Sequence, residues 1–113
     1  MVIANQRVVG HTFLRRLYAD AYFPDQVLDR ARVILLRLCA WIEAEPPDDL
    51  AGLYALTRTA TEEFNALETE FEAAGGMIDT VAREEIAEEF AFVASAYGFA
   101  DADVEELVAA REW

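Results

Sequence analysis

Four glutamates of the chain occur as two adjacent pairs, Glu84-Glu85 and Glu88-Glu89. On a helix, residues four positions apart lie on the same face. Glutamates that share a helix face invite comparison with carboxylate-bridged di-metal bundles. Those sites also need glutamates on facing helices and Glu-x-x-His pairs, yet the single histidine of the sequence is His11. A helical wheel places Glu84 and Glu88 in solvent, and Glu85 and Glu89 beside the apolar face. We therefore predict no metal and no cofactor, and we expect Glu85 and Glu89 to pair with arginine.

A second set of polar residues follows one edge of a helix predicted for residues 50–73. Its members are Tyr54, Thr57, Thr61, Asn65 and Glu68. If the next helix packs alongside, Glu85 and Glu89 join this polar strip. Buried polar groups must be hydrogen-bonded, so the polar strip is either structural or a site for a ligand or partner.

Other residues that could do chemistry lack the neighbours they need. Cys39 falls on the apolar margin of a helix without a base nearby in sequence, which indicates an inert core thiol. His11 lies near a predicted helix start, where a capping or surface role is favoured over that of a general base. Gly75-Gly76 ends a helix and opens no phosphate-binding loop. We predict no catalytic residue.

Length and charge limit the class of protein. The chain has 113 residues, enough for one domain, and a net charge of −13. Residues 1–42 hold six arginines against three aspartates (+3), whereas residues 43–113 hold three arginines against nineteen acids (−16). Such an acidic surface favours a basic protein partner and disfavours nucleic acid. We find no apolar run long enough for a membrane and no signal peptide, and the single cysteine excludes an internal disulfide. These features together predict a cytoplasmic protein.

The helix that the others must pack against is predicted from Asp25 to Glu45. Its apolar face carries Leu28, Ala31, Leu35, Leu38 and Ile42. This face is wider than one neighbouring helix covers, so two neighbours are expected.

The same helix carries a thinner stripe on its opposite side. The stripe consists of Val33, Leu36 and Ala40, with Arg37 alongside. A helix with two apolar sides is covered twice within its domain or once by a partner. We therefore expect a homodimer that uses this stripe.

The remaining helices follow from caps and breakers. They are expected at His11–Tyr22, from an Asp48 or Asp49 cap to about Ala73, from near Asp79 to Gly98, and from an Asp103 capping box to Trp113. Residues 1–10 are left as an N-terminal arm. The predicted fold is all-α: one domain, residues 1–113, with four main helices in an antiparallel bundle and a short C-terminal helix.

Several short motifs together resemble a known family. They are Leu17–Pro24, Leu36–Cys39, Leu53–Thr57, Ala60–Asn65, Ala82–Glu84 and Ala96–Phe99. With them the chain resembles an uncharacterised family of small acidic helical bacterial proteins, catalogued only as a domain of unknown function. The resemblance implies a stand-alone bacterial domain and supplies no activity, cofactor or catalytic residue.

Two functions remain open at this point. The first is a non-enzymatic acidic module that binds a basic protein, in the manner of immunity, antitoxin or regulatory proteins, because no nucleophile–base pair or metal set is present. The alternative is a small-ligand or carboxylate-based site at the edge between the third and fourth helices, built from Thr61, Asn65, Glu85 and Glu89.

Overall fold

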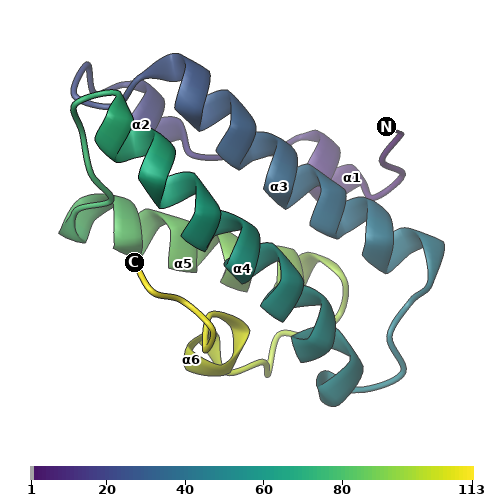
Figure 1. The fold of residues 1–113 in the computed structure, drawn as a ribbon. Helices are drawn as coiled ribbons and strands as arrows, with labels where there is room; N and C mark the ends of the chain where they lie inside the picture. Colours follow the sequence, from purple (N-terminus) through teal and green to yellow (C-terminus); the bar gives the residue numbers. More distant parts are fainter. Residues whose placement is uncertain (1) are drawn as a thin grey trace.

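A computed structural model describes residues 2–113 of the chain, which contain three long helices and three single-turn helices (Figure 1). The long helices are α3 (Asp25–Ala44), α4 (Leu50–Ala73) and α5 (Thr80–Ala96), and the short ones are α1 (Gln6–Val9), α2 (Arg15–Tyr18) and α6 (Val104–Leu107). No strand occurs within these residues. The all-α prediction is confirmed.

Helices α3 and α4 form an antiparallel hairpin that is the main packing contact of the fold (Figure 1). Pro46 and Pro47 prevent α3 from continuing, because proline has no backbone N–H to donate within a helix. Asp49 then caps α4 by accepting a hydrogen bond from the Gly52 N–H at 2.9 Å. The predicted bounds of both helices are confirmed to within a residue or two.

The end of α5 shows how locally these helices are determined. Gly98 has φ +91°, a left-handed conformation that glycine adopts without a steric penalty. The Phe99 N–H donates to the Ala94 carbonyl at 2.8 Å, and the Gly98 N–H donates to the Ser95 carbonyl at 3.1 Å. These two bonds form a Schellman motif, at the glycine where the helix is predicted to end.

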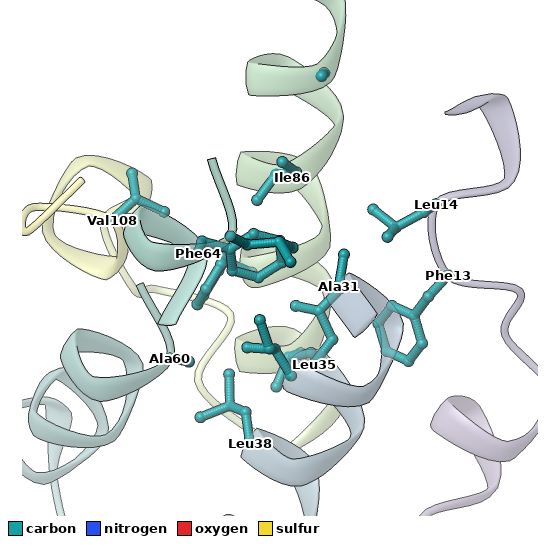
Figure 2. Packing of buried hydrophobic residues seen from close by; sticks show 14 of the residues in the cluster. Phe13, Leu14, Ala31, Leu35, Leu38, Ala60, Phe64, Ile86 and Val108 are labelled. Atoms are coloured by element: carbon teal, nitrogen blue, oxygen red, sulfur yellow. The ribbon is translucent and has the colours of Figure 1, made fainter. Parts of the chain in front are cut away.

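One hydrophobic cluster connects the helices (Figure 2). Leu35 of α3, Phe64 of α4 and Phe90 of α5 are all fully buried. The Phe64 and Phe90 rings meet at 5.8 Å between centroids. The apolar face predicted for α3 therefore lies in the core, together with apolar residues of α4 and α5.

The helix predicted over His11–Tyr22 is wrong over most of its length, because only Arg15–Tyr18 is helical. Leu14 has φ +60°, which stops a helix from continuing through it. The chain before it has no regular secondary structure and contacts Glu89 of α5 through His11 and Leu14. The prediction of four main helices is accordingly not confirmed.

Both ends of the chain also differ from expectation. The predicted arm contains α1, whose N-cap Asn5 accepts bonds from the N–H groups of Arg7 and Val8. The last helix ends at Leu107 instead of Trp113. Its Asp103 N–H donates to the Tyr54 hydroxyl at 3.0 Å, so a residue of α4 takes the place of the predicted capping-box glutamate.

Candidate functional site

The polar strip on α4 contacts the C-terminal segment. The Thr61 hydroxyl lies 2.8 Å from the Thr57 carbonyl and 3.2 Å from the Leu107 carbonyl. Asn65 donates to the Ala110 carbonyl at 3.0 Å and accepts from the Glu112 N–H at 2.8 Å. Together with the Tyr54–Asp103 bond, these contacts place residues 103–112 along α4.

Two further members of the strip have no such contact. Thr57 is buried and donates to the Tyr54 carbonyl at 3.2 Å, which is a local helical bond. Glu68 is half-buried. The other three members therefore bond backbone groups of the protein itself through their side chains. We call these three residues, Tyr54, Thr61 and Asn65, the C-terminal anchor.

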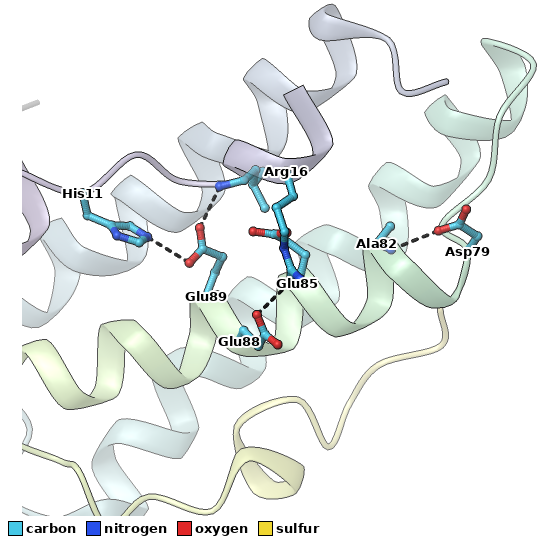
Figure 3. A network of polar contacts seen from close by, with 8 residues as sticks. His11, Arg16, Asp79, Ala82, Glu85, Glu88 and Glu89 are labelled. Carbon is cyan, nitrogen blue, oxygen red and sulfur yellow. Dashed lines mark hydrogen bonds and ion pairs between the residues drawn. The ribbon is translucent and has the colours of Figure 1, made fainter. Parts of the chain in front are cut away.

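Glu85 and Glu89 lie elsewhere, on the face of α5 that meets the N-terminal segment (Figure 3). One carboxylate oxygen of Glu89 lies 2.9 Å from His11 Nε2, and the other accepts the Leu14 N–H at 2.7 Å. Arg16 pairs with Glu85 and with Glu88. The expected pairing with arginine is present for Glu85, but it is wrong for Glu89, which meets His11 and a backbone N–H instead. Glu85 and Glu89 do not join the polar strip on α4.

This arrangement explains the left-handed conformation of Leu14. A non-glycine residue in that region costs free energy and persists where its surroundings hold it. Here the buried carboxylate of Glu89 accepts its N–H, and the Leu14 side chain is fully buried in the core. The hydrogen bond to Glu89 and the burial of the side chain thus hold Leu14 in its strained backbone conformation.

His11 has an aromatic environment. Its ring stacks on Phe92 at 3.8 Å between centroids, and it meets the Phe13 ring in an edge-to-face arrangement at 4.7 Å between centroids. A hollow of about 360 Å³ lies beside the pair of His11 and Glu89. No group of three or more His, Cys, Asp or Glu side chains in residues 2–113 is placed to hold a metal ion. The Glu89 carboxylate orients the His11 ring. Sequence patterns could not identify Glu89 as the partner of His11, because 78 positions separate the two residues.

A third carboxylate, Glu43 of α3, holds the chain just before α1. It accepts the N–H groups of Ala4 at 2.9 Å and Asn5 at 3.2 Å, as well as the Tyr97 hydroxyl. The Tyr97 hydrogen bond, followed by the backbone bonds, lowers the pKa of Glu43. We call Glu43, Glu85 and Glu89 the N-terminal anchor.

Cys39 behaves as predicted from its place on α3. Its side chain is completely buried, and burial raises the pKa of the thiol to about 12. A thiol that stays protonated at neutral pH is a poor nucleophile.

The stripe proposed for a dimer is only partly open. Val33 is 45% exposed, while Leu36 and Ala40 are half-buried. Arg37 pairs with Glu63 of α4, and its guanidinium lies 5.8 Å from the centre of the Trp41 ring. Helix α4 thus lies along one flank of the stripe, and the homodimer stays a prediction.

Another surface was not singled out by the sequence patterns. Five exposed acids lie at the end of the molecule formed by the α3–α4 loop and the α5–α6 connection: Glu45, Asp48, Asp49, Asp101 and Asp103. The two parts meet where Pro46 and Pro47 of the loop line one hollow together with Phe99 of the connection. We call this surface the acidic end. Within residues 2–113, none of its five carboxylates takes part in an ion pair.

The acidic end has two hollows, each lined in part by Pro46 and Pro47. One, of about 550 Å³, is lined in part by Tyr97 and Phe99. The other, of about 660 Å³, is lined in part by Trp41 and Leu56. Aromatic rings beside unpaired charges are a combination found at protein-binding surfaces.

Comparison with known proteins gives a family and no further relative. No helix among residues 2–113 has the length and apolar character needed to cross a membrane. No curated protein and no solved structure shows significant similarity to the chain. Residues 7–113, which include both anchors except for the contacts at Ala4 and Asn5, match a family of unknown function. The chain therefore belongs to the DUF5713 family.

Proposed function

We propose that this protein is a non-enzymatic binding module that recognises a basic protein through its acidic end. The single observation that carries the proposal is the grouping of five exposed carboxylates on this surface, none of which takes part in an ion pair within residues 2–113. Arginines elsewhere on the molecule, such as Arg30 and Arg58, pair with neighbouring glutamates. The acidic end therefore keeps its charge available to a partner.

The physical advantage of this surface lies in the rate and selectivity of association. Unpaired charge of one sign accelerates encounter with a partner of opposite sign and disfavours wrong partners. The apolar hollows beside Pro46 and Pro47 supply area that can be desolvated once contact is made. Immunity, antitoxin and regulatory proteins bind by this division of labour.

The alternative is a ligand site formed jointly by the polar strip and by Glu85 and Glu89. It has less support, because Thr61 and Asn65 bond the C-terminal segment while Glu85 and Glu89 face residues 11–16. Both sets have their hydrogen bonds taken up by the protein itself. A ligand would have to displace these contacts before it could bind.

A charge-neutralising pair of variants tests the proposal. Glu45→Gln combined with Asp48→Asn removes two charges from the acidic end and keeps the helix caps, because Glu45 caps α3 through its backbone N–H alone. Glu72→Gln combined with Glu84→Gln removes the same charge from exposed positions elsewhere. Each protein is immobilised and exposed to a lysate of its source organism at low and moderate salt, and bound basic proteins are quantified.

We expect wild type and the Glu72/Glu84 variant to retain the same basic protein. The acidic-end variant should retain at least about fivefold less, because two favourable charge contacts are lost. Equal retention by the two variants, or no retained basic protein, would contradict the proposal.

A further inference from the structure

The larger hollow of the acidic end lies at the point where α3 stops and α4 begins. Its wall includes Trp41 and Ala44 from the last turn of α3, Pro47 from the loop, and Leu56 from α4. It is open to solvent at a volume of about 660 Å³. These side chains form an apolar floor large enough for a long, unbranched side chain.

Three acids surround this floor. Glu45, Asp48 and Asp49 all line the hollow and are exposed. Asp49 uses one oxygen to cap α4, which leaves further acceptor sites on these three exposed carboxylates. A group that fills the hollow must therefore present several hydrogen-bond donors and positive charge at its rim.

The end of α3 adds to this negative charge. The last carbonyl groups of a helix lack intrahelical partners and carry the negative end of the helix dipole. The last turn of α3 contains no basic residue, and the Glu45 N–H bonds the Trp41 carbonyl alone. The carbonyl groups after Trp41 are thus directed towards the loop where the hollow lies.

The Trp41 ring is already placed against a cation. The guanidinium of Arg37 lies over it at 5.8 Å from the ring centre, and Arg37 does not line the hollow. Trp41 also lines the hollow, where its ring can meet a second cation. A tryptophan face is the best aromatic partner for a guanidinium.

The position of Pro47 is fixed by close packing. A Cβ added to Gly52 would meet the Pro47 Cβ at 3.1 Å, so glycine allows α4 to approach the loop closely. The wall formed by Pro47 is accordingly held against the first turn of α4. A preformed wall reduces the entropic cost of binding.

We propose that this hollow binds an arginine side chain of the basic partner, with the aliphatic stem on Pro47 and Leu56 and the guanidinium between Trp41 and the rim acids. Arginine fits better than lysine, because its planar group stacks on an aromatic ring and donates to two carboxylates at once. The inference rests on the proposed function and adds the anchoring side chain.

Nα-acetyl-arginine amide is a suitable probe, with the citrulline analogue as its uncharged isostere. Each is titrated into ¹⁵N-labelled protein at millimolar concentration. We expect saturable shifts of the Trp41 indole N–H and of the Gly52 and Leu56 amides with the arginine probe alone. Trp41→Leu should abolish them, while its circular dichroism and the shifts of α5 stay as in wild type.

Charge variants complete the test. Glu45→Gln with Asp48→Asn should weaken binding of the probe at least about fivefold, whereas Glu72→Gln with Glu84→Gln should leave it unchanged. Equal shifts from citrulline, shifts spread over all exposed acids, or unchanged binding by Trp41→Leu would each overturn the inference. If Trp41→Leu still retains the basic partner while the acidic-end variant loses it, the arginine pocket is wrong and the proposed function stands.

Discussion

The two ends of the chain are held to the long helices by different chemistry. Carboxylates of the N-terminal anchor bond the backbone and side chains of residues 4–16. Neutral hydroxyl and amide groups of the C-terminal anchor bond the backbone of residues 103–112. Hydrogen bonds to a charged group are stronger than those between neutral groups, and they depend on pH. The N-terminal segment should therefore be the more tightly held of the two at neutral pH, and the more sensitive to acid.

The largest effect is expected from removing the Glu89 carboxylate. Glu89→Ala leaves the Leu14 N–H and the His11 ring without their partner, which should lower the free energy of unfolding by about 3 kcal/mol. Glu88→Ala is the matched control on the same helix, because its side chain is 66% exposed and its loss should cost about 0.5 kcal/mol. Urea denaturation measures both. Equal losses would show that burial does not distinguish the two glutamates.

Removing the amide of Asn65 should have an intermediate effect. Asn65→Ala loses the bonds to Ala110 and Glu112 and should cost about 2 kcal/mol. Asn65→Asp keeps the acceptor for the Glu112 N–H and should cost less. Hydrogen exchange gives the location: the Glu112 amide should lose protection while the Leu14 amide keeps it. Equal loss at both positions would mean that the two anchors are coupled.

A smaller loss is expected at Thr61. Thr61→Val keeps the shape of the side chain and removes the hydroxyl that bonds the Leu107 carbonyl, at a cost of about 1 kcal/mol. Thr59→Val is the control, because Thr59 is exposed and its bond to the Ala55 carbonyl is long at 3.5 Å. Thermal melts of the pair measure the difference. A greater loss at Thr59 would contradict the assignment of Thr61 to the C-terminal anchor.

The smallest effect concerns Glu43 and acid. Its pKa in the folded protein lies below the ordinary value of 4.5, so it stabilises the fold at pH values above 4.5. That contribution is lost as the pH falls through the lowered pKa of the folded state. The exchange protection factors of the Ala4 and Asn5 amides should therefore fall on acidification before those of Asp103 and Glu112.

Tyr97→Phe sharpens this last comparison. It removes the first cause of the lowered pKa of Glu43, so the carboxyl should titrate at a higher pH in a ¹³C NMR experiment. Protection of Ala4 and Asn5 should then be lost at a higher pH as well. Identical titration of Glu43 in wild type and variant would show that the Tyr97 hydrogen bond has no influence on it.

Local patterns predicted the long helices well. Asp49 and Asp79 cap α4 and α5, and Gly98 ends α5, because each signal acts within a few residues of the helix end. The apolar spacing that includes Leu35 and Phe64 predicted the buried faces for the same reason: a helix fixes which residues share a side.

The sequence also located the polar groups without identifying what they bind. Tyr54, Thr61 and Asn65 were recognised as one edge of a helix, but their partners are backbone groups of a segment some 45 to 49 positions away. Backbone groups are the same in every residue, so no pattern in residues 103–112 could indicate this contact.

Tertiary structure alone decided the course of residues 11–22. Phe13, Leu14 and Leu17 have helical spacing and are all buried, yet the helix forms only from Arg15 onward. The Glu89 carboxylate, 75 positions from Leu14, accepts its N–H and stabilises a left-handed residue where the local pattern predicts a helix. The sequence by itself determined the three long helices and their buried faces, because capping and periodicity are local. Only the fold decided which carboxylate meets which N–H, because such a bond requires two distant segments to be already packed together.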